Sequence, residues 1–152
     1  MSYPIHGLVD MHTILNNERK FGGAIEVGYI RLRSGEQFPH AMITSVEMNG
    51  QLIYTVSFMS EQGENYICHI DDVSLIFEPV HKRIHELKNK AAKMKKTAEK
   101  LKYLKRLIQV NEGSTNPVFL KELAQVMEDL GEAAIQVPAV KNQPEKVQFK
   151  IA

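Results

Sequence analysis

The chain has 152 residues, of which 43% are hydrophobic and 24% charged, and its net charge at pH 7 is +1. These values suit one domain with an appendage or two small modules, and they exclude a chain too polar to form a core. Cys68 is the only cysteine, which excludes an intrachain disulfide and a zinc site built from several thiolates of one chain. No apolar run reaches the roughly 18–20 residues of a membrane span. The N-terminus lacks the pattern of a signal peptide, and we expect a cytoplasmic protein.

The N-terminal region, residues 1–23, is expected to be an extension that contains a short helix. Leu8, Met11 and Leu15 follow helical spacing, and Asp10 is placed to cap such a helix. The pair of glycines at 22–23 ends the segment.

Residues 24–79 alternate between apolar and polar positions, which predicts consecutive β-strands. The dipeptide at 49–50 is Asn-Gly, the strongest short hairpin signal because both residues tolerate positive φ. Five short strands separated by turns predict a small closed barrel. The residues expected to share strand faces are Ile25, Val27 and Tyr29; Met42, Thr44, Val46 and Met48; Leu52, Tyr54, Val56 and Phe58; and Tyr66, Cys68 and Ile70.

This segment resembles an SH3-like small β-barrel of the Tudor or KOW kind, over about 55 residues. The resemblance is carried by a glycine at the first strand ("VGYIRLR"), the second strand "AMI", the third strand "YTVSF" and the corner "HIDDVSLI". It implies a domain that binds peptides, modified side chains or nucleic acid, or that supports other parts of the chain. In a methyl-lysine reader the cage would be drawn from Tyr29, Phe38, Tyr54, Phe58 and Tyr66, of which Tyr54 and Phe58 are expected in the core.

After Pro79 the apolar period changes from 2 to 3.6, and a helix of about 30 residues is predicted from Val80 to Val110. Its apolar positions follow a 3–4 spacing that is typical of a packing seam. The residues of this predicted seam are Ile84, Leu87, Ala91, Met94, Ala98, Leu101 and Ile108.

A second helix is expected from Asn116, which caps it, and Pro117, which occupies its first position. Its apolar stripe is Leu120, Leu123, Met127 and Leu130, and Gly131 is expected to end it. Glu122, Glu128, Asp129 and then Glu132 predict an acidic outer face. The two helices are expected to pack as a hairpin, followed by an extended tail at 132–152, so that the whole fold class is α+β.

Positive charge is concentrated in the first of these helices. Residues 81–110 hold 11 of the 19 Lys and Arg residues but only two acidic ones, whereas the rest of the chain holds 8 basic and 16 acidic residues. Like charges on both flanks of the predicted seam disfavour self-association through it. The basic residues are Lys82, Arg83, Lys88, Lys90, Lys93, Lys95, Lys96, Lys100, Lys102, Lys105 and Arg106.

This charge predicts a non-enzymatic accessory protein that contacts phosphates of duplex DNA or structured RNA, largely independently of sequence. The alternative is a protein-interaction or assembly component whose basic helix docks on an acidic protein surface. The acidic helix of the same chain is a further neighbour for part of the charge. Bacterial or phage accessory proteins are an example of the class.

No catalytic, metal or cofactor site is expected. The chain lacks the phosphate-binding, dinucleotide-binding and serine-nucleophile motifs. His81 and His85 have the i, i+4 spacing of metal ligands on a helix, but Lys82 and Arg83 between them oppose a bound cation. Cys68 on an alternating strand is expected to be a core residue.

Overall fold

Eight strands are followed by two long helices in the computed structural model, which describes residues 3–135, with only the backbone of residues 132–135. The chain forms two compact units, Met1–Met94 and Lys95–Ala152, each of which is described by itself. The domain boundary expected at residue 80 thus differs from the division between the units. The extended tail was expected at residues 132–152, but residues 132–135 belong to α4, and residues 136–152 lie outside the described residues.

The N-terminal helices are α1 (Leu8–Asn16) and α2 (Glu18–Phe21). The strands are β1 (Ala24–Glu26), β2 (Tyr29–Leu32), β3 (Gln37–Pro39), β4 (Met42–Asn49), β5 (Leu52–Met59), β6 (Asn65–His69), β7 (Val73–Phe77) and β8 (Val80–Lys82). Two 3-10 turns, η1 (Ile70–Asp72) and η2 (Ile84–Glu86), precede β7 and follow β8. The two long helices are α3 (Lys90–Val110) and α4 (Pro117–Ile135).

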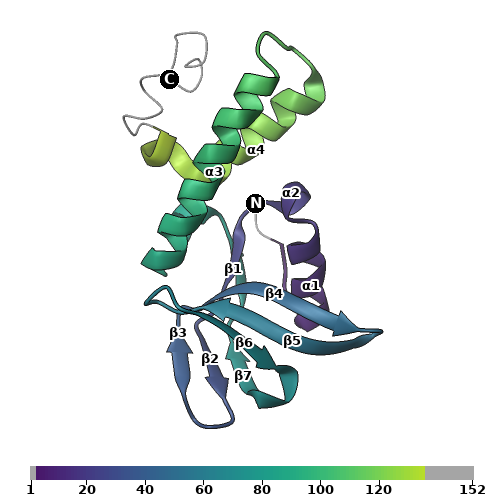
Figure 1. The fold of residues 1–152 in the computed structure, drawn as a ribbon, viewed down its shortest axis with the longest axis vertical. Helices are drawn as coiled ribbons and strands as arrows, with labels where there is room; N and C mark the ends of the chain where they lie inside the picture. Colours follow the sequence, from purple (N-terminus) through teal and green to yellow (C-terminus); the bar gives the residue numbers. More distant parts are fainter. Residues whose placement is uncertain (1–2, 136–152) are drawn as a thin grey trace. The chain divides into compact units, whose positions relative to one another are not determined.

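The strands form two antiparallel sheets (Figure 1). One has five strands in the order β6-β5-β4-β1-β8, and the other has three in the order β3-β2-β7. The α+β class is therefore confirmed. The sheets are open, and the closed five-stranded barrel that the sequence predicted is not shown. Some of the strands expected from the sequence are divided into shorter ones, because the chain turns within them. One turn separates β1 from β2, where Gly28 lies against Phe77. Another separates β3 from β4, where His40 adopts a positive φ.

The hairpin predicted at Asn49-Gly50 is confirmed. Asn49 pairs with Leu52 at the end of β4 and β5, and Gly50 has a φ of 67°. A positive φ suits glycine because no Cβ meets the backbone there. The pairing that this turn starts runs along both strands to Met42 and Met59.

The core of the first unit lies between the sheets and beneath α1. Met11 and Ile14 of α1 are buried in it, and the predicted helical residues Leu8 and Leu15 pack against it. Phe58 is fully buried, with the rings of Phe38 and Tyr66 beside it, at 5.1 and 5.2 Å between centroids. Phe38 and Tyr66 are half-buried and pack against this core, with 4.9 Å between their own ring centroids.

Tyr54, unlike Phe58, is not buried. Its side chain is 49% exposed, and its ring packs edge-on against His69. The expectation that Tyr54 is a core residue is wrong because it lies near the hairpin end of β5, beyond the buried positions Val56 and Phe58.

The helix predicted from Val80 begins ten residues later, at Lys90. Residues 80–82 instead form β8, which pairs with β1, and the 3-10 turn η2 follows. Asn89 caps α3, because its Oδ1 accepts a hydrogen bond of 3.0 Å from the backbone N–H of Ala92. Tertiary pairing with β1 therefore overrides the helical spacing of residues 80–89.

In the second unit, the described parts of α3 and α4 pack side by side, which confirms the helical hairpin (Figure 1). Leu104 and Val126 are buried in its core together with Leu130. Asn116 caps α4, its Oδ1 accepting from the N–H of Val118, and Gly131 interrupts the helix with a φ of 77°. The cap predicted at Asn116 is therefore confirmed. Gly131, predicted to end the helix, is instead a non-helical residue within α4, which continues to Ile135.

The predicted seam, however, has the wrong register. Ile84 and Leu87 lie before α3 and are buried in the first unit, Met94 is 73% exposed, and Ala98 is also exposed. Leu101 and Ile108 do pack against the core of the hairpin, in which the buried residue of α3 is Leu104. The error came from extending the heptad back into residues that are not helical. Ala91 is half-buried.

Candidate nucleic-acid interface

The structure separates the eleven candidate cations into groups with different surroundings. Lys82 forms an ion pair with Glu26, with 2.6 Å between Nζ and Oε1, and Arg83 is buried. Neither side chain presents its charge in the way expected for a phosphate contact. Both residues belong to the β8 region rather than to a helix.

Three further lysines are half-buried on α3. Lys96 lies 4.0 Å from Glu99, and the ammonium group of Lys100 lies over the ring of Tyr103, 5.8 Å from its centroid. Lys93 is half-buried in the first unit, where Lys88 and Lys90 are exposed. The three half-buried lysines are less suited than exposed cations to meet an extended phosphate backbone. Lys88 and Lys90 belong to the first unit, where Lys88 precedes α3 and Lys90 is its first residue.

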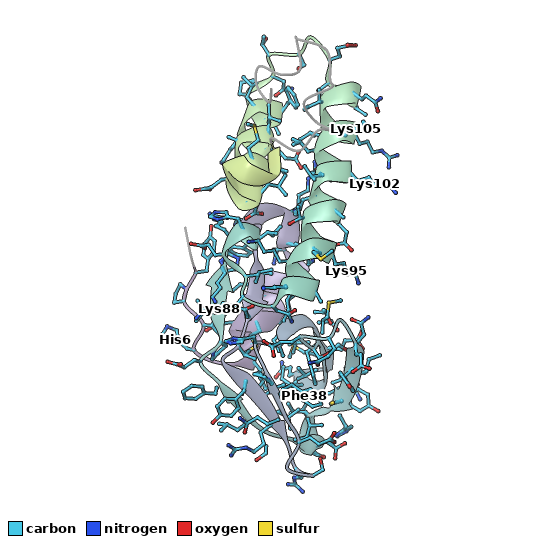
Figure 2. All side chains as sticks on the ribbon, turned by 90° about the vertical axis from the view of Figure 1, so that its left-hand side faces the viewer. His6, Phe38, Lys88, Lys95, Lys102 and Lys105 are labelled. Atoms are coloured by element: carbon cyan, nitrogen blue, oxygen red, sulfur yellow. The ribbon has the colours of Figure 1, made fainter. Side chains whose placement is uncertain are left out.

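The remaining four cations are exposed and lie on one face of α3 in the second unit: Lys95, Lys102, Lys105 and Arg106. We call this group the basic face. Figure 2 shows Lys95, Lys102 and Lys105 on the same side of the helix. Positions seven and eleven residues apart share a helix face at 3.6 residues per turn, so Lys95, Lys102 and Arg106 form one line.

One carboxylate lies beside the basic face: Glu99 is exposed on α3, four residues after Lys95 and three before Lys102, and its ion pair is with Lys96. None of its four cations forms an ion pair with a described carboxylate. Ala98 is exposed within the same face, and its small side chain allows another molecule to approach the backbone between Lys95 and Lys102. The line from Lys95 to Arg106 spans ~16 Å at 1.5 Å per residue.

The acidic outer face predicted for the second helix is not formed by its described residues. Asp129 is buried, and Glu122 accepts a hydrogen bond from the Tyr103 hydroxyl. The exposed positions of α4 include Lys121 as well as Glu128. Of the three carboxylates of α4 whose side chains are described, only Glu128 is exposed, and none is ion-paired with a cation of the basic face.

Other polar residues considered for chemistry have structural surroundings. His81 is buried in β8 and His85 is exposed in η2, so the two do not share a helix face. His69 caps η1 by accepting from the N–H of Asp71. Burial raises the pKa of the Cys68 thiol, and the carboxylates of Asp72 and Glu36 raise it further. Among residues 3–131, no three histidine, cysteine or carboxylate side chains gather as a metal site.

Sequence reasoning missed the residues that determine where α3 begins. Glu26 is buried on β1, and it accepts hydrogen bonds from the backbone N–H groups of Lys88 and Asn89. The available signal was "KN" at 88–89, since asparagine is a preferred N-cap. The apolar residues at 84 and 87 hide this signal, because they extend the helical periodicity towards the N-terminus.

Within the described residues, no helix combines the length and apolarity that crossing a membrane requires. Comparisons with protein families, with curated proteins and with solved structures found no match to this chain. The resemblance of residues 24–78 to SH3-like barrels therefore stays a prediction, and the functional argument depends on the geometry of the basic face.

Proposed function

We propose that this protein is a non-enzymatic nucleic-acid-binding protein, which contacts the phosphates of duplex DNA or structured RNA through its basic face. The observation that carries the proposal is the alignment of four exposed cations on one side of α3, none of them ion-paired within the described chain. Phosphate contacts of this kind determine affinity but carry no sequence information. The basic face replaces the larger set of eleven residues expected from the sequence.

The number of cations sets the expected dependence on salt. Four phosphate contacts correspond to a slope of about −3.6 in a plot of log K against log salt, from the rule of about −0.9 per contact. Affinity for a mixed-sequence duplex should therefore fall by roughly 50-fold between about 50 and about 150 mM salt. Fluorescence anisotropy of a labelled duplex measures this change directly.

A matched pair of variants tests which residues are responsible. The first changes Lys95, Lys102 and Lys105 to Gln, which should reduce the slope to about −0.9 and weaken binding of different sequences alike. The second removes the same charge elsewhere, at Lys20, Arg33 and Lys121, all of which are exposed. Equal weakening by the two variants, or no duplex binding at low salt, would overturn the proposal.

The alternative partner is an acidic protein surface, because carboxylates suit the same cations. If the protein binds a polyglutamate chain but binds neither duplex DNA nor structured RNA, the acidic protein partner is favoured. Competition between labelled duplex and unlabelled polyglutamate on the wild-type protein separates the two partners.

A further inference from the structure

The outer face of the three-stranded sheet carries apolar and aromatic side chains. Side chains alternate along a strand, so Ile30 of β2 points into the core while Tyr29 and Arg31 lie on the other face. Tyr29 pairs with Phe77 of β7, and Arg31 pairs with Leu75. Phe77 is 42% exposed and Leu75 is 38% exposed. We call these four residues, Tyr29, Arg31, Leu75 and Phe77, the sheet face.

The aromatic rings of the sheet face are already stacked on protein neighbours. The rings of Tyr29 and Phe77 are nearly parallel, with 4.9 Å between centroids and 18° between planes. The guanidinium of Arg31 lies over the ring of Tyr29, 5.3 Å from its centroid. A Cβ at Gly28 would lie 2.8 Å from the ring of Phe77, so glycine is needed for this packing. With Tyr29 contacted by Phe77 and Arg31, little ring surface remains on which a nucleobase could stack.

Arg31 is held in place but its charge is not neutralised. Its Nε donates a hydrogen bond of 3.2 Å to Oε1 of Gln37, and Tyr29 supports the plane of the guanidinium. No described carboxylate forms an ion pair with Arg31. Lys82, by contrast, is paired with buried Glu26. A fixed guanidinium binds a planar carboxylate well, because less side-chain entropy is lost for each hydrogen bond formed.

We propose that the sheet face docks an extended protein segment with an acidic side chain two residues from an apolar one. The carboxylate binds Arg31, and the apolar side chain lies on Phe77 and Leu75. Arg31 and Tyr29 are two residues apart on β2, so their pairs with Leu75 and Phe77 form rows separated by about 6.7 Å. That separation matches side chains two residues apart on one face of an extended peptide. This proposal concerns a protein partner and does not depend on nucleic-acid binding by the basic face.

The test uses the full chain and three labelled peptides of about ten residues, which repeat Glu-Thr-Leu, Glu-Thr-Phe or Glu-Thr-Trp. Binding is followed by NMR amide shifts and by anisotropy. We expect shifts centred on the sheet face for at least one peptide. Arg31→Gln should weaken that binding at least five-fold, and Leu75→Thr should weaken it as well. The matched control is Arg33→Gln, which removes the same charge from a neighbouring exposed residue and should change binding less than two-fold.

Several outcomes would overturn the proposal. One is the absence of shifts at the sheet face with all three peptides. Others are equal binding of peptides with Gln in place of Glu, and equal loss of affinity in Arg31→Gln and Arg33→Gln. A single-stranded oligonucleotide that shifts the same amides, while the peptides do not, would assign the sheet face to nucleic acid instead. The NMR spectrum of each variant shows whether it remains folded.

Discussion

Glu26 and Asn89 are 63 positions apart in the chain, and the backbone N–H of Asn89 donates a hydrogen bond of 2.8 Å to the Glu26 carboxylate. The same carboxylate pairs with Lys82 and accepts from the N–H of Lys88. Asn89 in turn donates from its side chain to the carbonyl of Met59 and caps α3. A single buried carboxylate thus joins β1 to the residues that start the long helix.

Changing Glu26 to Ala should lower the free energy of unfolding by about 3–5 kcal/mol. The side chain is only 2% exposed, so its removal leaves two N–H groups without their acceptor and Lys82 without its counter-charge. Urea denaturation measures the change. The control is Glu47→Ala on β4, which should cost less than about 0.5 kcal/mol because Glu47 is exposed. A similar small cost for Glu26→Ala would show that the buried pair does not stabilise the fold.

Changing Asn89 to Ala should cost about 1–2 kcal/mol, since it removes the N-cap of α3 and the hydrogen bond to Met59. Asn89→Ser should recover part of this loss, because a serine hydroxyl also accepts from the N–H of Ala92. Thermal unfolding shows which of the two variants is more stable. If serine proved no better than alanine, the loss of the cap would not explain the destabilisation by Asn89→Ala.

The register of the helical hairpin can be tested with two substitutions on α3. Leu104→Ala should destabilise by about 2–5 kcal/mol because it leaves a cavity beside Val126 and Leu130. Met94→Ala should cost less than about 0.5 kcal/mol, since that side chain is 73% exposed. Circular dichroism during urea titration gives the free energy of unfolding of both variants. The reverse order would support the seam that the sequence predicted.

Cys68 should react slowly with iodoacetamide at neutral to mildly alkaline pH. Burial, with the charges of Asp72 and Glu36, raises the pKa of its thiol, so less of the reactive thiolate is present than in a free cysteine. Alkylation should accelerate in urea, where the thiol recovers its ordinary pKa. Mass spectrometry over time gives the two rates, and equal rates would contradict the raised pKa.

The same shift has a consequence for stability at high pH. Because the folded state binds the Cys68 proton more tightly than the unfolded chain does, the unfolded thiol ionises first as pH rises. The free energy of unfolding of the wild type should therefore decrease, relative to Cys68→Val, above the ordinary pKa of a thiol. Below that pH the difference between the two proteins should stay constant.

Local sequence signals predicted the features that neighbouring residues alone determine. The Asn49-Gly50 turn, the helix around Met11 and the cap at Asn116 each depend on backbone preferences within a few residues. Alternation also located most strand residues and the burial of Phe58. Apolar residues on α4, such as Leu123, correctly indicated a helical hairpin.

Long-range partners decided the rest. Residues 80–82 have apolar spacing compatible with a helix, but they pair with β1 and become a strand. The eleven cations look alike in the sequence, yet Lys82 lies against Glu26 and Lys102 faces outward. The periodicity of apolar residues indicates which side chains share a face of a helix or strand. Burial and ion pairing depend instead on segments that meet only when the chain folds. For that reason the sequence determined that this protein concentrates positive charge, and the tertiary structure decided which four cations form the basic face.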